Sequence, residues 1–124
     1  MPKALVVDDS KAVRMILGRA LKEIGYEVSE AGDGKQALEL IAQDKAGTGL
    51  VLADWNMPEM NGLDLLKRLR QDKELDSLVV VMVTTETDLD QMTMALEAGA
   101  NEYVMKPFTK EILMGKLQLA GIVV

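Results

Sequence analysis

Short apolar runs alternate with longer segments of helical periodicity along the whole chain. Residues 4–7, 50–53 and 78–83 are entirely apolar, whereas residues 27–31 and 102–105 mix apolar and polar positions. The alternation in residues 27–31 predicts a strand at the edge of a sheet. The six consecutive apolar residues at 78–83 predict a central strand that is covered on both faces. The pattern therefore predicts five strands.

The segments that follow the strands repeat apolar residues at helical spacing, and several begin with residues that cap helices. Ser10 is predicted to cap the first helix, Thr87 or Asp88 the fourth, and Thr109 the last. The expected core-facing positions of the five helices are Val13, Ile16, Leu17, Ala20, Leu21, Ile24, Ala37, Leu38, Ile41, Ala42, Leu63, Leu66, Leu69, Leu89, Met92, Ala95, Leu96, Ile112, Leu113, Leu117 and Ala120. On the fourth helix, Met92 or Met94 is expected to stay partly exposed.

Strand and helix alternate five times, which predicts an α/β fold with right-handed crossovers. The expected architecture is a doubly wound parallel sheet of five strands in the order 2-1-3-4-5, with five helices on its two faces. At 124 residues the chain fits one domain spanning residues 1–124, since domains most often have about 100–150 residues.

Four of the predicted strands end in polar side chains. Asp8 and Asp9 follow the first strand, Asp54 the third, Thr84 the fourth and Lys106 the fifth. In an open parallel sheet, ligands bind beyond the carboxyl ends of the strands, beside the point where the strand order reverses. We therefore expect these five residues to share one site.

Composition narrows the chemistry of such a site. The chain has no cysteine and no histidine, so a bound metal must be held by oxygen, which favours Mg²⁺ or Mn²⁺. The formal net charge of -6 argues against direct binding to nucleic acid or an anionic membrane. No signal peptide or membrane span is evident, and we expect a cytoplasmic monomer.

The three acids predict a metal site with a nucleophile beside it. Clustered carboxylates repel one another unless a cation joins them. We expect Asp9, Asp54 and the backbone carbonyl of Asn56 to bind the metal directly, and Asp8 to bind it through water. A carboxylate also attacks phosphorus to give an aspartyl phosphate, and Asp54 is the best placed for that role.

The remaining two side chains suit a transferred phosphoryl group. Phosphoryl transfer depends on cations and hydrogen-bond donors at the non-bridging oxygens. The phosphoryl group has three such oxygens, and the metal, Lys106 and the Thr84 hydroxyl supply one partner for each. Each residue by itself is more simply explained as a helix cap or a solvated side chain. The prediction of a phosphoryl site therefore rests on the occurrence of all five residues together. Lys106-Pro107 is also a candidate cis peptide.

Four motifs in this order resemble the receiver domain of two-component response regulators, and most closely its single-domain members that act in chemotaxis. The motifs are Val7-Asp8-Asp9-Ser10, Asp54-Trp55-Asn56-Met57-Pro58 with Asn61-Gly62, Val83-Thr84-Thr85-Glu86, and Tyr103-Val104-Met105-Lys106-Pro107-Phe108. The similarity spans essentially the whole chain. It implies that Asp54 accepts a phosphoryl group from the phosphohistidine of a sensor histidine kinase.

The resemblance also implies a switch and an output surface. Thr84 matches the switch hydroxyl, Lys106 the family's site lysine, and Tyr103 the aromatic residue that moves inward when the hydroxyl turns to the phosphate. The output face would comprise residues 88–98, 103–105 and 109–119, which in the chemotaxis members bind the flagellar motor switch. We expect no enzyme activity beyond weak self-dephosphorylation, with Asn56 and Glu86 setting the phosphate lifetime. Thr85 is bulkier than the small residue usual in the family, and Gly115 weakens the last helix.

Three alternatives remain open from the sequence. A haloacid dehalogenase-type phosphatase shares the chemistry, but its nucleophile follows the first strand, with a second acid two residues on. A flavodoxin-like electron carrier shares the topology, although aromatic residues make up only 3% of this chain. The chain could also be a receiver excised from a larger regulator or hybrid kinase.

Overall fold

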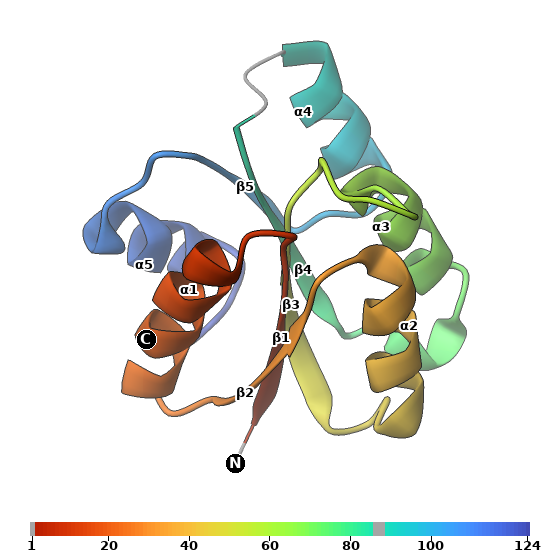
Figure 1. The fold of residues 1–124 in the computed structure, drawn as a ribbon, viewed down its shortest axis with the longest axis horizontal. Helices are drawn as coiled ribbons and strands as arrows, with labels where there is room; N and C mark the ends of the chain where they lie inside the picture. Colours follow the sequence, from red (N-terminus) through yellow and green to blue (C-terminus); the bar gives the residue numbers. More distant parts are fainter. Residues whose placement is uncertain (1, 86–88) are drawn as a thin grey trace.

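The computed structural model describes residues 2–85 and 89–124, which form a five-stranded parallel sheet with helices on both faces (Figure 1). The strands are β1 Lys3–Val7, β2 Glu27–Ala31, β3 Thr48–Ala53, β4 Val79–Thr84 and β5 Glu102–Met105. The helices are α1 Lys11–Glu23, α2 Gly34–Gln43, α3 Gly62–Arg70, α4 Leu89–Glu97 and α5 Lys110–Leu119, with a 3-10 turn at Lys73–Leu75. Within the described ranges, none of the helices has the length and apolarity needed to span a membrane.

The strand order is β2-β1-β3-β4-β5, as the sequence predicted. Helices α1 and α5 cover one face, and α2, α3 and α4 cover the other (Figure 1). Alternate residues of each central strand enter one of two cores. On β1, Leu5 and Val7 face the core under α2, α3 and α4, while Ala4 and Val6 face the core under α1 and α5. This two-sided burial explains the unbroken apolar runs of the central strands.

Side-chain caps fix where the helices begin. The hydroxyls of Ser10 and Thr109 accept from the backbone N–H groups of Val13 and Ile112, as expected for caps of α1 and α5. The Asp33 carboxylate caps α2 by accepting from the Gln36 N–H, a cap that was not predicted from the sequence. The predicted cap of α4, Thr87 or Asp88, lies outside the described residues.

Five helical positions predicted to face the core are exposed instead, namely Ala42 and four larger residues. The exposed fraction is 59% for Ile16, 73% for Leu89, 47% for Leu96 and 51% for Ile112. Ile16, Leu96 and Ile112 each adjoin a buried residue of the same helix, and consecutive helical residues point about 100° apart. The apolar stripe of these helices is thus wider than the strip that the sheet covers. The exposed methionine expected on α4 is Met94.

Candidate functional site

Strand register brings the polar ends of the strands together. Val7 of β1 pairs with Ala53 of β3, so the following residues, Asp8 and Asp54, emerge side by side. The Asp54 N–H donates to the Val7 carbonyl at 2.9 Å, which extends the pairing of β1 with β3. The Lys106 N–H donates to the Thr84 carbonyl at 2.9 Å and extends the pairing of β4 with β5 in the same way.

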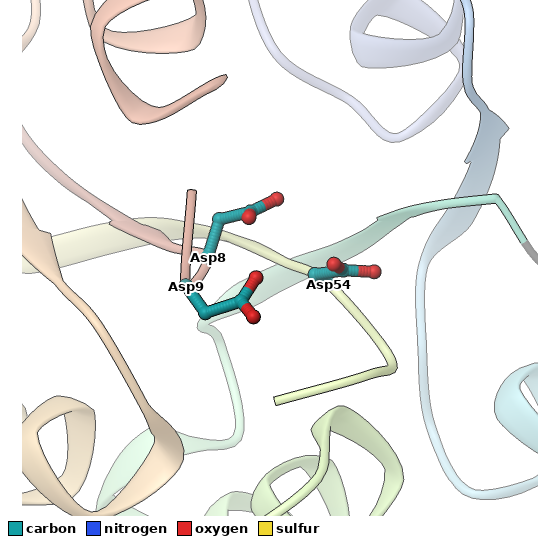
Figure 2. A group of neighbouring side chains, drawn as sticks. All are labelled: Asp8, Asp9 and Asp54. Atoms are coloured by element: carbon teal, nitrogen blue, oxygen red, sulfur yellow. The ribbon is translucent and has the colours of Figure 1, made fainter. Parts of the chain in front are cut away.

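Three carboxylates gather at this edge, on the turns that leave β1 and β3 (Figure 2). One oxygen each from Asp8, Asp9 and Asp54 lies within 4.8 Å of the others. Asp8 and Asp54 are buried, whereas Asp9 is exposed. Close like charges of this kind favour a bound cation, because each carboxylate raises the cost of ionising the others.

Lys106 reaches two of the three acids. Its Nζ lies 2.7 Å from Asp8 Oδ2 and 3.3 Å from Asp54 Oδ2. Burial of the amine lowers the pKa of Lys106, but the hydrogen bond to Asp8 and the charges of Asp54 and Asp8 outweigh it. The net result is a pKa above the usual 10.5. The Lys106 ammonium is therefore held in its charged form and bridges Asp54 and Asp8. The Lys106–Pro107 peptide is cis.

The acidic cluster fits a hard divalent cation. Asp54 Oδ1 is buried and has no hydrogen-bond partner among the residues that the structure describes, although a buried carboxylate oxygen needs one. Asp8, Asp9 and Asp54 supply oxygen ligands only, which suits Mg²⁺ or Mn²⁺. A cation among the three carboxylates would satisfy Asp54 Oδ1 and relieve their mutual repulsion.

The two predicted switch residues are both buried. Thr84 is the last residue of β4, adjacent to the Lys106 backbone, and is fully buried. Tyr103 of β5 is 2% exposed and packs in the core under α2, α3 and α4. The ring therefore already occupies an inward position in this structure.

The structure describes only one of the two residues predicted to control the phosphate lifetime. Asn56 lies two residues beyond Asp54 in the loop that leaves β3, and it is exposed. Glu86 lies outside the described residues. Their joint role stays a prediction.

Gly62 is a site residue whose role sequence reasoning missed. A Cβ on Gly62 would lie 2.1 Å from the Asp54 carbonyl oxygen and 2.8 Å from Met82 Cε. The Gly62 N–H also donates to the Trp55 carbonyl at 2.8 Å, which closes the loop onto α3. From the sequence, Asn61-Gly62 was treated only as part of a motif, but glycine is required here because α3 begins against the backbone of Asp54.

Comparison with known proteins assigns the family. The model of the response regulator receiver domain family matches residues 4–118. The chain belongs to this family. Receiver domains are signalling switches of two-component systems, not classical enzymes, and they bind Mg²⁺ at an acidic pocket such as the one formed by Asp8, Asp9 and Asp54. Membership decides against the phosphatase and the electron-carrier alternatives.

Individual relatives agree with this assignment. The receiver domain is 45% identical to chemotaxis protein CheY1 of Helicobacter pylori over 118 residues, 94% of each chain. It matches the structure of the chemotaxis response regulator CheY4 of Vibrio cholerae with a TM-score of 0.87 and 36% identity, over 97% of this chain and 98% of that one. It also matches a two-component response regulator/GGDEF domain protein with a TM-score of 0.88 and 28% identity, over 97% of this chain and 49% of that one.

Proposed function

We propose that this receiver domain is a chemotaxis-type switch that takes a phosphoryl group onto Asp54 from a sensor histidine kinase, in a reaction that depends on Mg²⁺. The observation that carries the proposal is the surroundings of Asp54. One carboxylate oxygen faces the Lys106 ammonium, and the other is buried beside two further acids with no hydrogen-bond partner in the described parts of the chain. A kinase must supply the phosphohistidine because the chain has no histidine.

Asp9, Asp54 and the Asn56 carbonyl would hold the metal directly, with Asp8 acting through water. When bound, Mg²⁺ supplies positive charge at a phosphoryl oxygen. In the transfer, an Asp54 carboxylate oxygen forms a bond to phosphorus as the bond from phosphorus to the donor nitrogen breaks. The electron pair of the broken bond stays on that nitrogen. Lys106 stabilises the charge on a second phosphoryl oxygen and Thr84 donates to a third.

The charge change at Asp54 is proposed to drive the output. Thr84 turns toward the phosphoryl group and leaves a space that the inward Tyr103 ring fills. The ring is then held inward, which changes the surface formed by α4, β5 and α5. Tyr103 already lies inward here, so phosphorylation would stabilise an existing ring position.

We expect Tyr103→Ala to uncouple α4 from the phosphorylated site. Without the Tyr103 ring, a movement of Thr84 has no side chain through which to change the position of α4. Backbone amide NMR shifts recorded with Mg²⁺, before and after acetyl phosphate, would move on α4 in the parent protein but only near Asp54 in the variant. Equal shifts on α4 in both proteins would contradict the coupling.

Exposed apolar side chains on α4, β5 and α5 suit partner binding. Leu89, Met94, Leu96, Met105 and Ile112 are each at least 45% exposed. Similarity to the chemotaxis protein CheY1 and to CheY4 favours the flagellar motor switch as the partner of this face. The match to half of a GGDEF regulator keeps a receiver from a larger protein as the alternative.

Asn56 and Glu86 are proposed to limit the access of water to the phosphorylated site. The double variant Asn56→Ala, Glu86→Ala is then expected to lose its phosphoryl group several-fold faster, because smaller side chains open the path of the attacking water. The decay is measured after removal of acetyl phosphate, with Glu59→Ala, a change in the same exposed loop, as control. An unchanged lifetime would remove this role.

Trp55 provides the direct test of the proposed function, because it is the only tryptophan and adjoins Asp54. We expect its fluorescence to change saturably with Mg²⁺, and again when acetyl phosphate is added. Asp54→Asn should keep a cooperative unfolding transition but lose the second change and the added mass of the phosphoryl group. A phosphoryl group on Asp54→Asn, or none on the parent protein, would refute the assignment of Asp54.

A further inference from the structure

We propose that Arg14 is a positioning residue for the acidic pair, and that it sets the affinity of the site for its divalent cation. This inference rests on the metal site of the proposed function. The Arg14 Nη1 donates to the Asp8 carbonyl oxygen at 2.6 Å, and Nε donates to Glu30 Oε1 at 3.0 Å. The Arg14 side chain is 18% exposed and its contact with the Asp8 carbonyl is partly buried, whereas Glu30 is 43% exposed.

The position of Arg14 in the helix explains its reach. Its backbone N–H donates to the Ser10 carbonyl at 3.0 Å, in the first turn of α1. Helical side chains tilt toward the N-terminus of the helix, so the guanidinium extends back over the turn that carries the acids. Glu30 on β2 holds the other edge of the guanidinium.

The carbonyl that Arg14 holds belongs to the peptide joining Asp8 to Asp9. The rest of Asp8 is fixed by other partners. Its N–H donates to the Ala31 carbonyl at 3.1 Å, Oδ1 accepts from the Ser10 N–H at 2.9 Å, and Oδ2 accepts from Lys106. The Arg14 contact fixes the plane of the next peptide, and that plane sets where the exposed Asp9 carboxylate points.

Positioning and simple charge make opposite predictions for this residue. Taken only as a charge, a guanidinium near three carboxylates opposes a second cation, so its removal would tighten metal binding. Taken as a support for the peptide, its removal frees the Asp9 side chain to move, and metal binding weakens. Loss of groups that orient metal ligands typically costs about 10–100-fold in affinity.

The experiment measures Mg²⁺ affinity from Trp55 fluorescence, and Mn²⁺ affinity from the EPR signal of the free ion, in the unphosphorylated protein. We expect Arg14→Met to weaken both by about 10-fold. Arg14→Lys keeps the charge but cannot span the two acceptors with a rigid fork, so it should weaken binding by a smaller factor. Arg19→Met, on the exposed side of the same helix, removes the same charge and should bind at least as tightly as the parent protein.

A second readout separates positioning from loss of the site. At saturating Mg²⁺, phosphorylation of Arg14→Met by acetyl phosphate should approach the parent rate, because only the affinity has changed. Urea unfolding without metal checks that the variants are folded. The inference is wrong if Arg14→Met binds the two ions at least as tightly as the parent protein does. It is also wrong if Arg14→Lys binds them as tightly as the parent protein. If the parent protein itself binds neither ion, the proposed metal site fails instead.

Discussion

Gly62→Ala is expected to lower the free energy of unfolding by about 3 kcal/mol, at the upper end of the usual cost of overpacking. The new methyl group would overlap the Asp54 carbonyl oxygen, which is 2.1 Å away, and the Met82 side chain. Met82 could turn aside, but the backbone carbonyl cannot move without displacing Asp54. We therefore expect slower phosphorylation of Asp54 as well as lower stability, both compared with the parent protein.

Gly115→Ala is the matched control within the same chain. Gly115 lies inside α5, and a Cβ there would have no heavy atom of residues 2–85 or 89–124 within 4 Å, apart from its own helix backbone and chain neighbours. Replacing an interior helical glycine with alanine stabilises by up to about 1 kcal/mol. In urea unfolding, a glycine-to-alanine substitution should thus lower the free energy of unfolding at position 62 and raise it at position 115. A Gly62→Ala protein as stable as the parent would show that the α3 start does not depend on this close approach.

Lys106→Met is expected to reduce the rate of phosphorylation by acetyl phosphate by about 10²-fold, the usual effect of losing one group that stabilises transition-state charge. Without metal it should also lower stability by about 2 kcal/mol. Removing one partner of a fully buried pair costs about 3–5 kcal/mol, and partial exposure of Lys106 reduces that figure. Lys73→Met, in the exposed 3-10 turn, is the control.

The pH dependence of this stability difference has a definite sign. The pKa of Lys106 is raised above 10.5 in the folded protein. The ammonium therefore contributes its full stabilisation below that pH and loses it as the pH rises through the raised pKa. The difference between the parent and Lys106→Met should stay constant from about pH 8 to pH 10 and shrink only above. A difference that shrinks below pH 9 would contradict the contacts with Asp8 and Asp54.

Metal binding should respond to Lys106 and Arg14 in opposite directions. Lys106 contacts the carboxylates themselves, so its ammonium competes with a divalent cation, and Lys106→Met should bind Mg²⁺ more tightly. Arg14 contacts a backbone carbonyl, so its loss should weaken binding. Two cations beside the same acids thus differ in effect because they hold different atoms. The same Trp55 titration would measure both.

Pattern alone predicted the fold because the pattern is local. Apolar runs of strand length, separated by amphipathic helices, admit few arrangements once crossovers are right-handed. The same regularity placed Asp8, Asp9, Asp54, Thr84 and Lys106 at one edge of the sheet. The structure brings the three acids and Lys106 into contact, and joins Thr84 to Lys106 through the backbone.

Periodicity was less informative about which helical side chains the core covers. Ile16, Leu96 and Ile112 fit a helical stripe but lie in solvent. A helix can have more apolar positions than its sheet can cover, and the sequence does not give the orientation of the helix on the sheet. For these residues the packing of the helices decided the outcome.

The sequence by itself predicted the fold class, the strand order, the family, and the gathering of the three acids and Lys106 at one edge of the sheet, because residue type and periodicity along the chain leave few parallel arrangements once crossovers are right-handed. The tertiary structure alone decided that α3 begins against the Asp54 carbonyl, that Tyr103 is inward, and that Arg14 holds the Asp8 carbonyl. These contacts depend on distances of a few ångströms between elements, and no spacing along the chain encodes such distances.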